Sequence, residues 1–145
     1  MKIETKKLYP DAQLPARGSE SAAGYDLHAR TPNGPVCVPP GETRMIGTGL
    51  ALVIPQGYFS AVFARSGLSV KCGLRPANCV GVIDSDYRGE VIAALHNDGP
   101  EPQIVNNGDH IAQLVLLPFC PAEYIRTDVL HGTERGTGGF GSTGI

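Results

Sequence analysis

The chain has 145 residues, of which 41% are hydrophobic, and its formal net charge at neutral pH is −2. That length suits one globular domain, and the small charge excludes a protein-wide basic field for binding nucleic acid or an anionic membrane. The 19 glycines and 12 prolines follow no fixed period, so they predict turns between many short segments rather than a helix-rich fold. We expect residues 1–145 to form a single domain.

Six β-like runs predict strands along the whole chain. They cover residues 43–48, 50–54, 58–63, 78–83, 90–96 and 111–119, and clusters of Gly, Pro, Asn and Asp separate them. Residues 91–95 and 112–117 are almost continuously apolar, which fits strands that are buried on both faces. This rhythm is typical of an all-β sandwich or barrel.

One short helix is predicted after Arg65. Ser66 is the expected N-cap, with Leu68 and Val70 near the core. At the other end of the chain, residues 132–145 have almost nothing to bury, so we expect a mobile tail until a ligand orders it.

The four cysteines, Cys37, Cys72, Cys79 and Cys120, lack the spacing of a zinc site. They are interpreted as buried or half-buried apolar residues in a reducing compartment. Residues 1–9 lack the apolar stretch of a secretory signal, and no apolar run approaches the ~20 residues of a membrane helix. These features predict a cytoplasmic protein.

Two polar stretches precede the middle of the chain. Residues 23–27 indicate a turn that enters a strand, where Asp26 either caps backbone groups or belongs to a site. Arg65 and Ser66 form a candidate anion pocket, because a guanidinium and the first N–H groups of a helix both donate to anions. The alternative is a surface Arg beside an ordinary N-cap.

Residues 81–90, GVIDSDYRGE, predict a β-hairpin with a polar tip. Asp84 lies where the first strand ends, so its carboxylate can point into a cleft and take a proton from water. Tyr87 at the turn offers a flat face to a sugar or a base. The alternative is a plain hairpin whose Asp residues satisfy the turn.

Gln113 lies inside an apolar run that follows the turn at residues 108–110. A buried amide without a partner costs ~1–3 kcal/mol, so Gln113 needs a definite partner, either a neighbouring backbone group or a ligand. His110 fits a turn residue better than a phosphate contact.

The stretch from Arg135 to Gly144 combines an arginine, the hydroxyl pair Ser142 and Thr143, and five glycines. Its GxGxxG pattern is not a dinucleotide-binding fingerprint, because too few residues follow for a helix, and no Lys precedes Ser142 as in a Walker loop. Bare backbone N–H groups beside an Arg suit a polyphosphate, and Phe140 suits stacking on a flat ligand. The alternative is a disordered tail with an incidental Phe. Together, these stretches predict a nucleoside polyphosphate site with a hydrolytic base.

In order and spacing, the five stretches resemble the five motifs of the trimeric deoxyuridine triphosphate nucleotidohydrolases (dUTPases), over residues 23–144. The resemblance implies a β-sandwich or jelly roll of the β-clip type, in a homotrimer whose active sites are each assembled from three chains. It implies Mg²⁺-assisted hydrolysis of dUTP to dUMP and pyrophosphate. Such an activity keeps uracil out of DNA and supplies dUMP for thymidylate synthesis.

The resemblance also assigns roles to residues. Asp84 and Gln113 match the catalytic positions, Asp84 holding the attacking water, and Asp26 matches a residue linked through water to Mg²⁺. Tyr87 matches the residue that packs under the deoxyribose and leaves no room for a 2′-hydroxyl. The remaining expected substrate contacts are Arg65, Ser66, Gly67, Asn78, Gly81, Val82, Arg135, Phe140, Gly141, Ser142 and Thr143.

Two positions depart from the family pattern. Ala64 stands where Pro is usual, and His110 stands where Arg is usual, which removes a permanent positive charge. Two rival functions are a dCTP deaminase on the same fold and a non-catalytic protein that uses the nucleotide as a switch. The Asp-Ser-Asp-Tyr-Arg sequence of residues 84–88 argues against the first rival, and the presence of Asp84, Arg65 and Arg135 argues against the second.

Overall fold

The computed structural model describes residues 1–139 and confirms an all-β fold with one short helix. Its elements are β1 (Glu4–Lys7), β2 (Tyr25–His28), β3 (Val36–Val38), β4 (Thr43–Gly47), β5 (Leu50–Val53), β6 (Tyr58–Phe63), α1 (Ser66–Cys72), β7 (Leu74–Pro76), β8 (Val80–Ile83), β9 (Ile92–Asn97), β10 (Gln103–Val105) and β11 (His110–Pro118). No helix in the described part is long and apolar enough to cross a bilayer.

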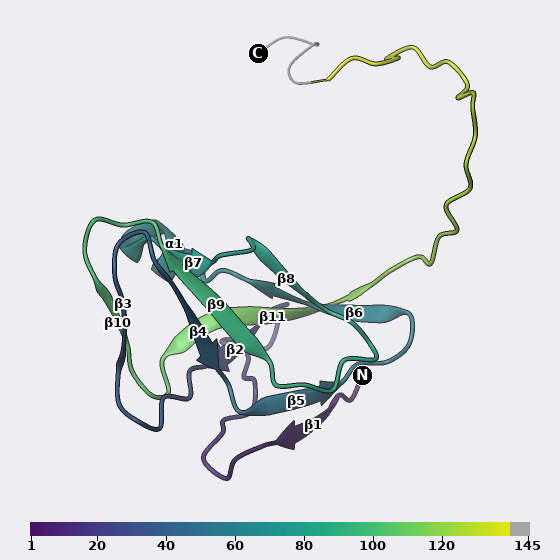
Figure 1. The fold of residues 1–145 in the computed structure, drawn as a ribbon. Helices are drawn as coiled ribbons and strands as arrows, with labels where there is room; N and C mark the ends of the chain where they lie inside the picture. Colours follow the sequence, from purple (N-terminus) through teal and green to yellow (C-terminus); the bar gives the residue numbers. More distant parts are fainter. Residues whose placement is uncertain (140–145) are drawn as a thin grey trace.

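Two antiparallel sheets form the body (Figure 1). One has the strand order β2-β11-β6-β8, and the other has the order β4-β9-β7. The pairs β1-β5 and β3-β10 complete the described part. Most paired strands are distant in sequence, so long-range pairing defines the topology.

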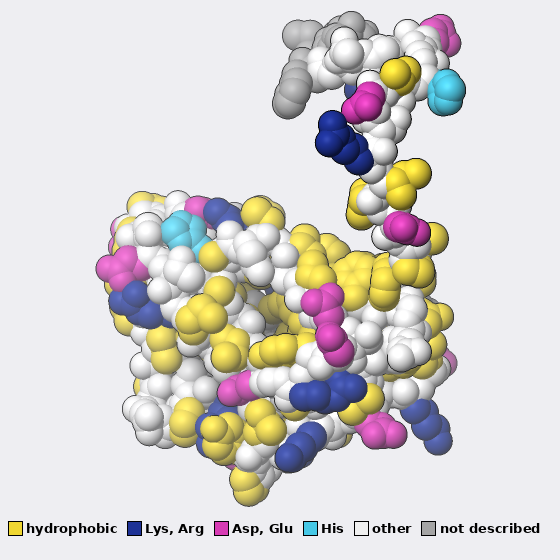
Figure 2. Space-filling view, turned by 45° about the vertical axis from the view of Figure 1, so that its right-hand side comes forward, with side chains coloured by type: hydrophobic (Ala, Val, Ile, Leu, Met, Phe, Trp, Pro, Cys, Tyr) yellow, Lys and Arg dark blue, Asp and Glu magenta, His cyan; other side chains and the backbone are white. Residues whose placement is uncertain are grey.

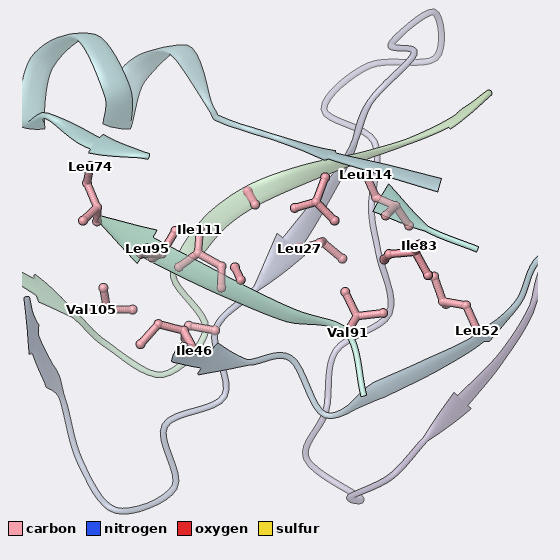
Figure 3. Close-up of a cluster of buried hydrophobic side chains, with 14 of the residues drawn as sticks. Leu27, Ile46, Leu52, Leu74, Ile83, Val91, Leu95, Val105, Ile111 and Leu114 are labelled. Carbon is pink, nitrogen blue, oxygen red and sulfur yellow. The ribbon is translucent and has the colours of Figure 1, made fainter. Parts of the chain in front are cut away.

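The hydrophobic core draws on both body sheets (Figure 3). Leu27, Ile111 and Leu114 come from β2 and β11, while Ile46 and Leu95 come from β4 and β9. Burying such side chains contributes about 1.5–3 kcal/mol each, which holds the two sheets together and fixes the ends of their strands. Two of the predicted site residues, Arg65 and Asp84, lie just beyond such strand ends.

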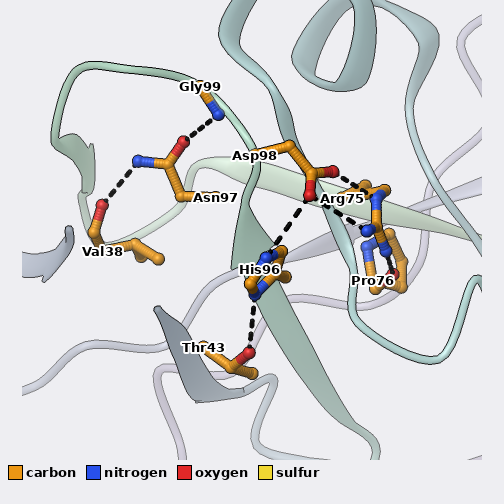
Figure 4. A network of polar contacts seen from close by, with 8 residues as sticks. All are labelled: Val38, Thr43, Arg75, Pro76, His96, Asn97, Asp98 and Gly99. Atoms are coloured by element: carbon orange, nitrogen blue, oxygen red, sulfur yellow. Dashed lines mark hydrogen bonds and ion pairs between the residues drawn. The ribbon is translucent and has the colours of Figure 1, made fainter. Parts of the chain in front are cut away.

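The three-stranded sheet ends in a polar junction (Figure 4). Asn97 is fully buried; its amide nitrogen donates to the carbonyls of Val38 (2.9 Å) and Glu101 (2.8 Å), and its oxygen accepts from the Gly99 N–H (2.9 Å). Next to it, Asp98 pairs with Arg75, and this ion pair raises the pKa of Arg75. The junction joins β3, β9 and the following loop.

The predicted strand regions are confirmed, each overlapping an observed strand, and α1 begins where a helix was expected. The predicted cap is wrong: Arg65 holds the extended N-cap position, and Ser66 is already the first helical residue. Leu68 packs against the core as expected. Val70 does not, because its side chain lies on the outer face of α1 and is 83% exposed.

Three further expectations were wrong. Residues 81–90 do not form a β-hairpin, because β8 pairs with β6 in one sheet whereas β9 pairs with β4 and β7 in the other. Residues 91–95 are not buried on both faces: Ala93 and Leu95 face the core, but Ile92 is exposed. In this single chain Cys37, Cys79 and Cys120 are also exposed, while Cys72 is half-buried.

The chain leaves the body after β11 ends at Pro118 and runs away from it (Figure 1). Tail residues 119–137 are exposed, including the large apolar side chains of Tyr124, Ile125, Val129 and Leu130. Hydrophobic side chains also gather on the body near the root of the tail (Figure 2). The segment outside the body therefore begins about a dozen residues before the tail that the sequence indicated.

Candidate active site

Asp26, Arg65 and His110 meet where β2, β6 and β11 lie side by side. Arg65 Nε donates to Asp26 Oδ1 (2.9 Å), and His110 Nδ1 lies 2.9 Å from Asp26 Oδ2. Arg65 Nη1 also donates to the His110 carbonyl (3.3 Å). Both oxygens of this half-buried carboxylate are therefore occupied by basic side chains. The pairing with Asp26 holds the Arg65 guanidinium at the end of β6.

His28 lies beneath this cluster and was missed from the sequence. Its ring packs edge-on against the His110 ring, with centroids 4.4 Å apart. Burial, with a smaller repulsion from His110, lowers the pKa of His28, so its imidazole is neutral at pH 7. The signal was weak, because a lone His in a strand gives no hint of a stacked partner 82 residues away.

Gln113 lies in the middle of the same sheet, opposite Asp26 on β2 and Phe63 on β6. Its Nε2 donates to the Ala64 carbonyl (2.8 Å), so the partner that the sequence left open is a backbone group. A Cβ on Gly24 would lie only 2.5 Å from Gln113 Oε1. Gly24, which sequence reasoning did not single out, therefore leaves the space that this amide occupies.

Ser66 and Gly67 follow Arg65 as the first two residues of α1, and both are exposed. The cap position has no side-chain hydrogen bond. The first turn of a helix has backbone N–H groups without intrahelical partners, so hydroxyl and N–H donors lie beside the Arg65 guanidinium. This half of the site is rich in donors, as the sequence predicted for an anion pocket.

A second group of predicted residues lies along and beyond β8. Asn78 Nδ2 would be 3.4 Å from a Cβ placed on Gly81, so the amide packs over this glycine. Val82 is exposed on the same strand. Asp84 follows the buried Ile83, and its exposed carboxylate accepts no hydrogen bond from any residue between 1 and 139.

Tyr87 closes the turn after Asp84. Its N–H donates to the Asp84 carbonyl (3.2 Å), and its hydroxyl donates to the Glu90 carbonyl (3.0 Å). A Cβ on Gly89 would lie 2.3 Å from the hydroxyl oxygen, so the ring lies directly on this glycine. The ring is about half exposed and presents a fixed flat face beside the free carboxylate.

Within one chain, Asp84 and Arg65 lie at opposite ends of β6. Val80 pairs with Phe63 and Ile83 pairs with Ser60, so β8 runs away from the Arg65 end. Counting along β6 at about 3.3 Å per residue places Asp84 roughly 20 Å from Arg65. The structure brings Asp26, Arg65 and Gln113 together and leaves Asp84 apart from them.

Arg135 lies on the tail, away from both groups. Its Nε donates to the Gly138 carbonyl (2.8 Å), and the Gly138 N–H donates to the Arg135 carbonyl (3.1 Å). The predicted contacts Phe140, Gly141, Ser142 and Thr143 lie outside the described residues. A cavity of about 570 Å³ is lined mainly by apolar residues, such as Ile3, Leu14 and Leu116, rather than by the predicted site residues.

The family model of the dUTPases matches residues 10–144. A deoxyuridine 5′-triphosphate nucleotidohydrolase of Nautilia profundicola is 46% identical over 144 residues, covering 99% of each chain. The corresponding protein of Desulfitobacterium hafniense is 50% identical over 134 residues, covering 92% of this chain and 88% of its own.

Solved structures agree with these sequence matches. The dUTPase of Staphylococcus bacteriophage 80alpha with dUpNHpp superposes with a TM-score of 0.87 at 28% identity, over 99% of each chain. The fold, the order of the motifs and the relatives point to the same group of proteins. The chain therefore belongs to the dUTPase family of enzymes.

Proposed function

We propose that this chain hydrolyses dUTP to dUMP and pyrophosphate with Asp84 as the general base. The observation that carries the proposal is the exposed carboxylate of Asp84, which has no partner among residues 1–139 and lies beside the fixed Tyr87 ring. Asp84 would take a proton from water, whose oxygen then bonds to the α-phosphorus. The bond from that phosphorus to the α,β-bridging oxygen breaks, and pyrophosphate leaves with the electron pair.

The β8 side supplies the nucleoside contacts. The Asn78 amide over Gly81 can pair with the edge of uracil, next to the exposed backbone at Val82. The Tyr87 ring would pack against the deoxyribose, and a 2′-hydroxyl would then collide with it. These contacts support selection of a deoxyribonucleotide.

The other half supplies positive charge and donors for the phosphates. Arg65, Ser66 and Gly67 form one donor group, held in place by Asp26. Gln113 would lie near the attacked phosphate and help to orient the water. Arg135, together with residues 140–143, would contribute from the tail. Donors in these positions would stabilise the negative charge that grows in the transition state.

Mg²⁺ fits this site as an ion bound by the triphosphate rather than directly by protein side chains. No group of three or more His, Cys, Asp or Glu residues that could hold a metal occurs in the described part of the chain. Asp26 offers one carboxylate, already bonded to Arg65 and His110, which suits an outer contact through water. When bound, Mg²⁺ would neutralise part of the phosphate charge.

We also propose that copies of the chain complete each other's sites in a homotrimer. The support is the separation of Arg65 from Asp84 and the large apolar side chains that one chain leaves exposed, including Met45, Val82, Ile92 and Ile104. Within this proposal the chain is a single domain with a phosphate-binding tail over residues 132–145. Its cellular role would be to limit dUTP and supply dUMP in the cytoplasm.

Pyrophosphate release with Mg²⁺ across dUTP, UTP, dTTP and dCTP tests the proposal, with an ammonia assay on dCTP for deamination. We expect rapid release from dUTP alone, and removal of Mg²⁺ should slow it. Asp84→Asn should lower kcat by about a hundred- to ten-thousandfold while dUTP binding persists. Binding lost together with activity would give Asp84 a structural role, and an inert wild-type protein would overturn the proposed function.

A further inference from the structure

Residues 84–90 form a loop between two core residues. Ile83 and Val91, at its two ends, are both buried in the core (Figure 3). The loop's internal hydrogen bonds join Tyr87 to Asp84 and to Glu90, and Arg88 to the carbonyls of Ser85 and Tyr87. These bonds shape the loop without fixing it to the body.

Glu90 makes the one hydrogen bond between this loop and the rest of residues 1–139. Its Oε1 accepts from the Gly49 N–H at 2.7 Å. The same oxygen would lie 2.5 Å from a Cβ on Gly47, so the carboxylate rests directly on that glycine. No basic side chain in the described chain pairs with it, so Glu90 acts as a hydrogen-bond acceptor.

The receiving turn is rigid. Gly49 has a φ of 72°, and a Cβ there would come within 2.8 Å of Ala12 Cβ and 2.9 Å of Arg30 Cδ, so only glycine fits. Thr48 is buried, and its hydroxyl donates to the Val91 carbonyl (2.7 Å). The Val91 N–H in turn donates to the Leu50 carbonyl (2.7 Å). Glu90 therefore attaches the loop to a fixed point.

The position of the Tyr87 ring depends on this attachment. The ring rests on Gly89, and its hydroxyl bonds to the main-chain carbonyl of Glu90. Any displacement of the backbone at residues 89–90 moves the ring with it. The Glu90 side chain, through its hydrogen bond with Gly49, is therefore linked to the position of the Tyr87 ring.

We propose that Glu90 is a positioning residue for sugar selection: by binding Gly49 it holds Tyr87 where a 2′-hydroxyl would collide. The inference rests on the proposed function, because it assigns the Tyr87 ring to the sugar. The inference adds Glu90 as a residue whose substitution changes the discrimination between deoxyribose and ribose without removing any substrate contact.

The test compares Glu90→Ala, Glu90→Gln and Gly89→Ala in the full chain, with Glu101→Ala as the control. Glu101 is exposed, and its side chain makes no hydrogen bond in the described chain. The readouts are the ratio of kcat/KM for dUTP over UTP, and the ratio of Kd values for non-hydrolysable dUTP and UTP analogues.

Glu90→Ala should lower both ratios about tenfold, the effect of one lost hydrogen bond to a charged acceptor. Gly89→Ala should do likewise by displacing the ring, whereas Glu90→Gln, which keeps an acceptor oxygen, should restore most of the discrimination. Unchanged ratios in Glu90→Ala, or an equal loss in Glu90→Gln, would overturn the inference. If Glu90→Ala does not fold, Gly47→Ala displaces the carboxylate without removing it and is judged by the same ratios.

The binding readout separates this inference from the proposed function. A wild-type protein that does not cleave dUTP, yet prefers the deoxy analogue and loses that preference in Glu90→Ala, would sustain the role of Glu90 and refute the hydrolysis. Normal hydrolysis, with discrimination that Tyr87→Ala abolishes and Glu90→Ala leaves intact, would do the reverse.

Discussion

At the scale of single residues, glycines lie directly beneath three side chains of the proposed site. Gly24 lies beneath Gln113, Gly81 beneath Asn78, and Gly89 beneath Tyr87. A methyl group on Gly24 or Gly89 would clash with the polar side chain above it, whereas one on Gly81 would lie 3.2 Å from Val62 Cβ and 3.4 Å from the Asn78 amide nitrogen. Conformational freedom of the backbone is not the reason, since none of the three has a positive φ. Their role is steric.

Gly24→Ala therefore tests the placement of Gln113. The added methyl group would push the amide from the Ala64 carbonyl, and we expect kcat/KM for dUTP to fall about tenfold as that hydrogen bond is lost. Gly18→Ala is a matched control, because nothing lies within 4 Å of its Cβ position. Steady-state kinetics on both variants measure this loss of kcat/KM. Equal activity in the two variants would show that Gln113 needs no fixed position.

At the scale of elements, local pattern predicted which segments are strands but not their partners. The runs around β5, β6 and β11 were clear because apolar residues follow one another there almost without interruption. By contrast, β1 is mostly Glu, Thr and Lys, while β3, β7 and β10 have three residues each, too short for a periodic signal.

The wrong hairpin has the same origin. The apolar runs at residues 81–83 and 91–95 flank a polar stretch, which is the local signature of a hairpin. Pairing of β8 with β6, and of β9 with β4 and β7, is a long-range choice that the local sequence does not express. The motifs of the site were recognisable because their residue types carry chemistry. That Asp84 and Arg65 lie at opposite ends of β6 followed only from the strand register.

The tail is an element whose loss should affect catalysis alone. Residues 119–137 are exposed and belong to no strand of the body, so deleting residues 135–145 should leave the melting temperature within about 2 °C of the wild type. Turnover of dUTP should fall at least about tenfold, because Arg135 and the following donors are removed. Circular dichroism melts and initial rates measure the two effects, and a fully active truncation would exclude the tail from the reaction.

At the scale of the whole molecule, the distance between Arg65 and Asp84 predicts that two chains, each defective in one of these residues, can complement each other. Asp84→Asn and Arg65→Ala should each be nearly inactive alone. After mixing and subunit exchange, sites shared between copies would regain both groups in about a quarter of cases at equal amounts. Pyrophosphate release before and after exchange measures this recovery, with the mass in solution reporting the oligomer. Mixtures that stay inactive despite exchange would place each site within one chain.

If copies do complete each other's sites, a newly made chain carries two incomplete parts of the site, one with Arg65 and one with Asp84, at opposite ends of strand β6. The total activity would then follow the concentration of assembled oligomers. Strong dilution would therefore abolish the activity although every chain stays folded. A loss-of-function allele expressed together with a wild-type allele would inactivate sites in mixed oligomers. Dominant inheritance of the loss of function would therefore be the genetic consequence of this strand register.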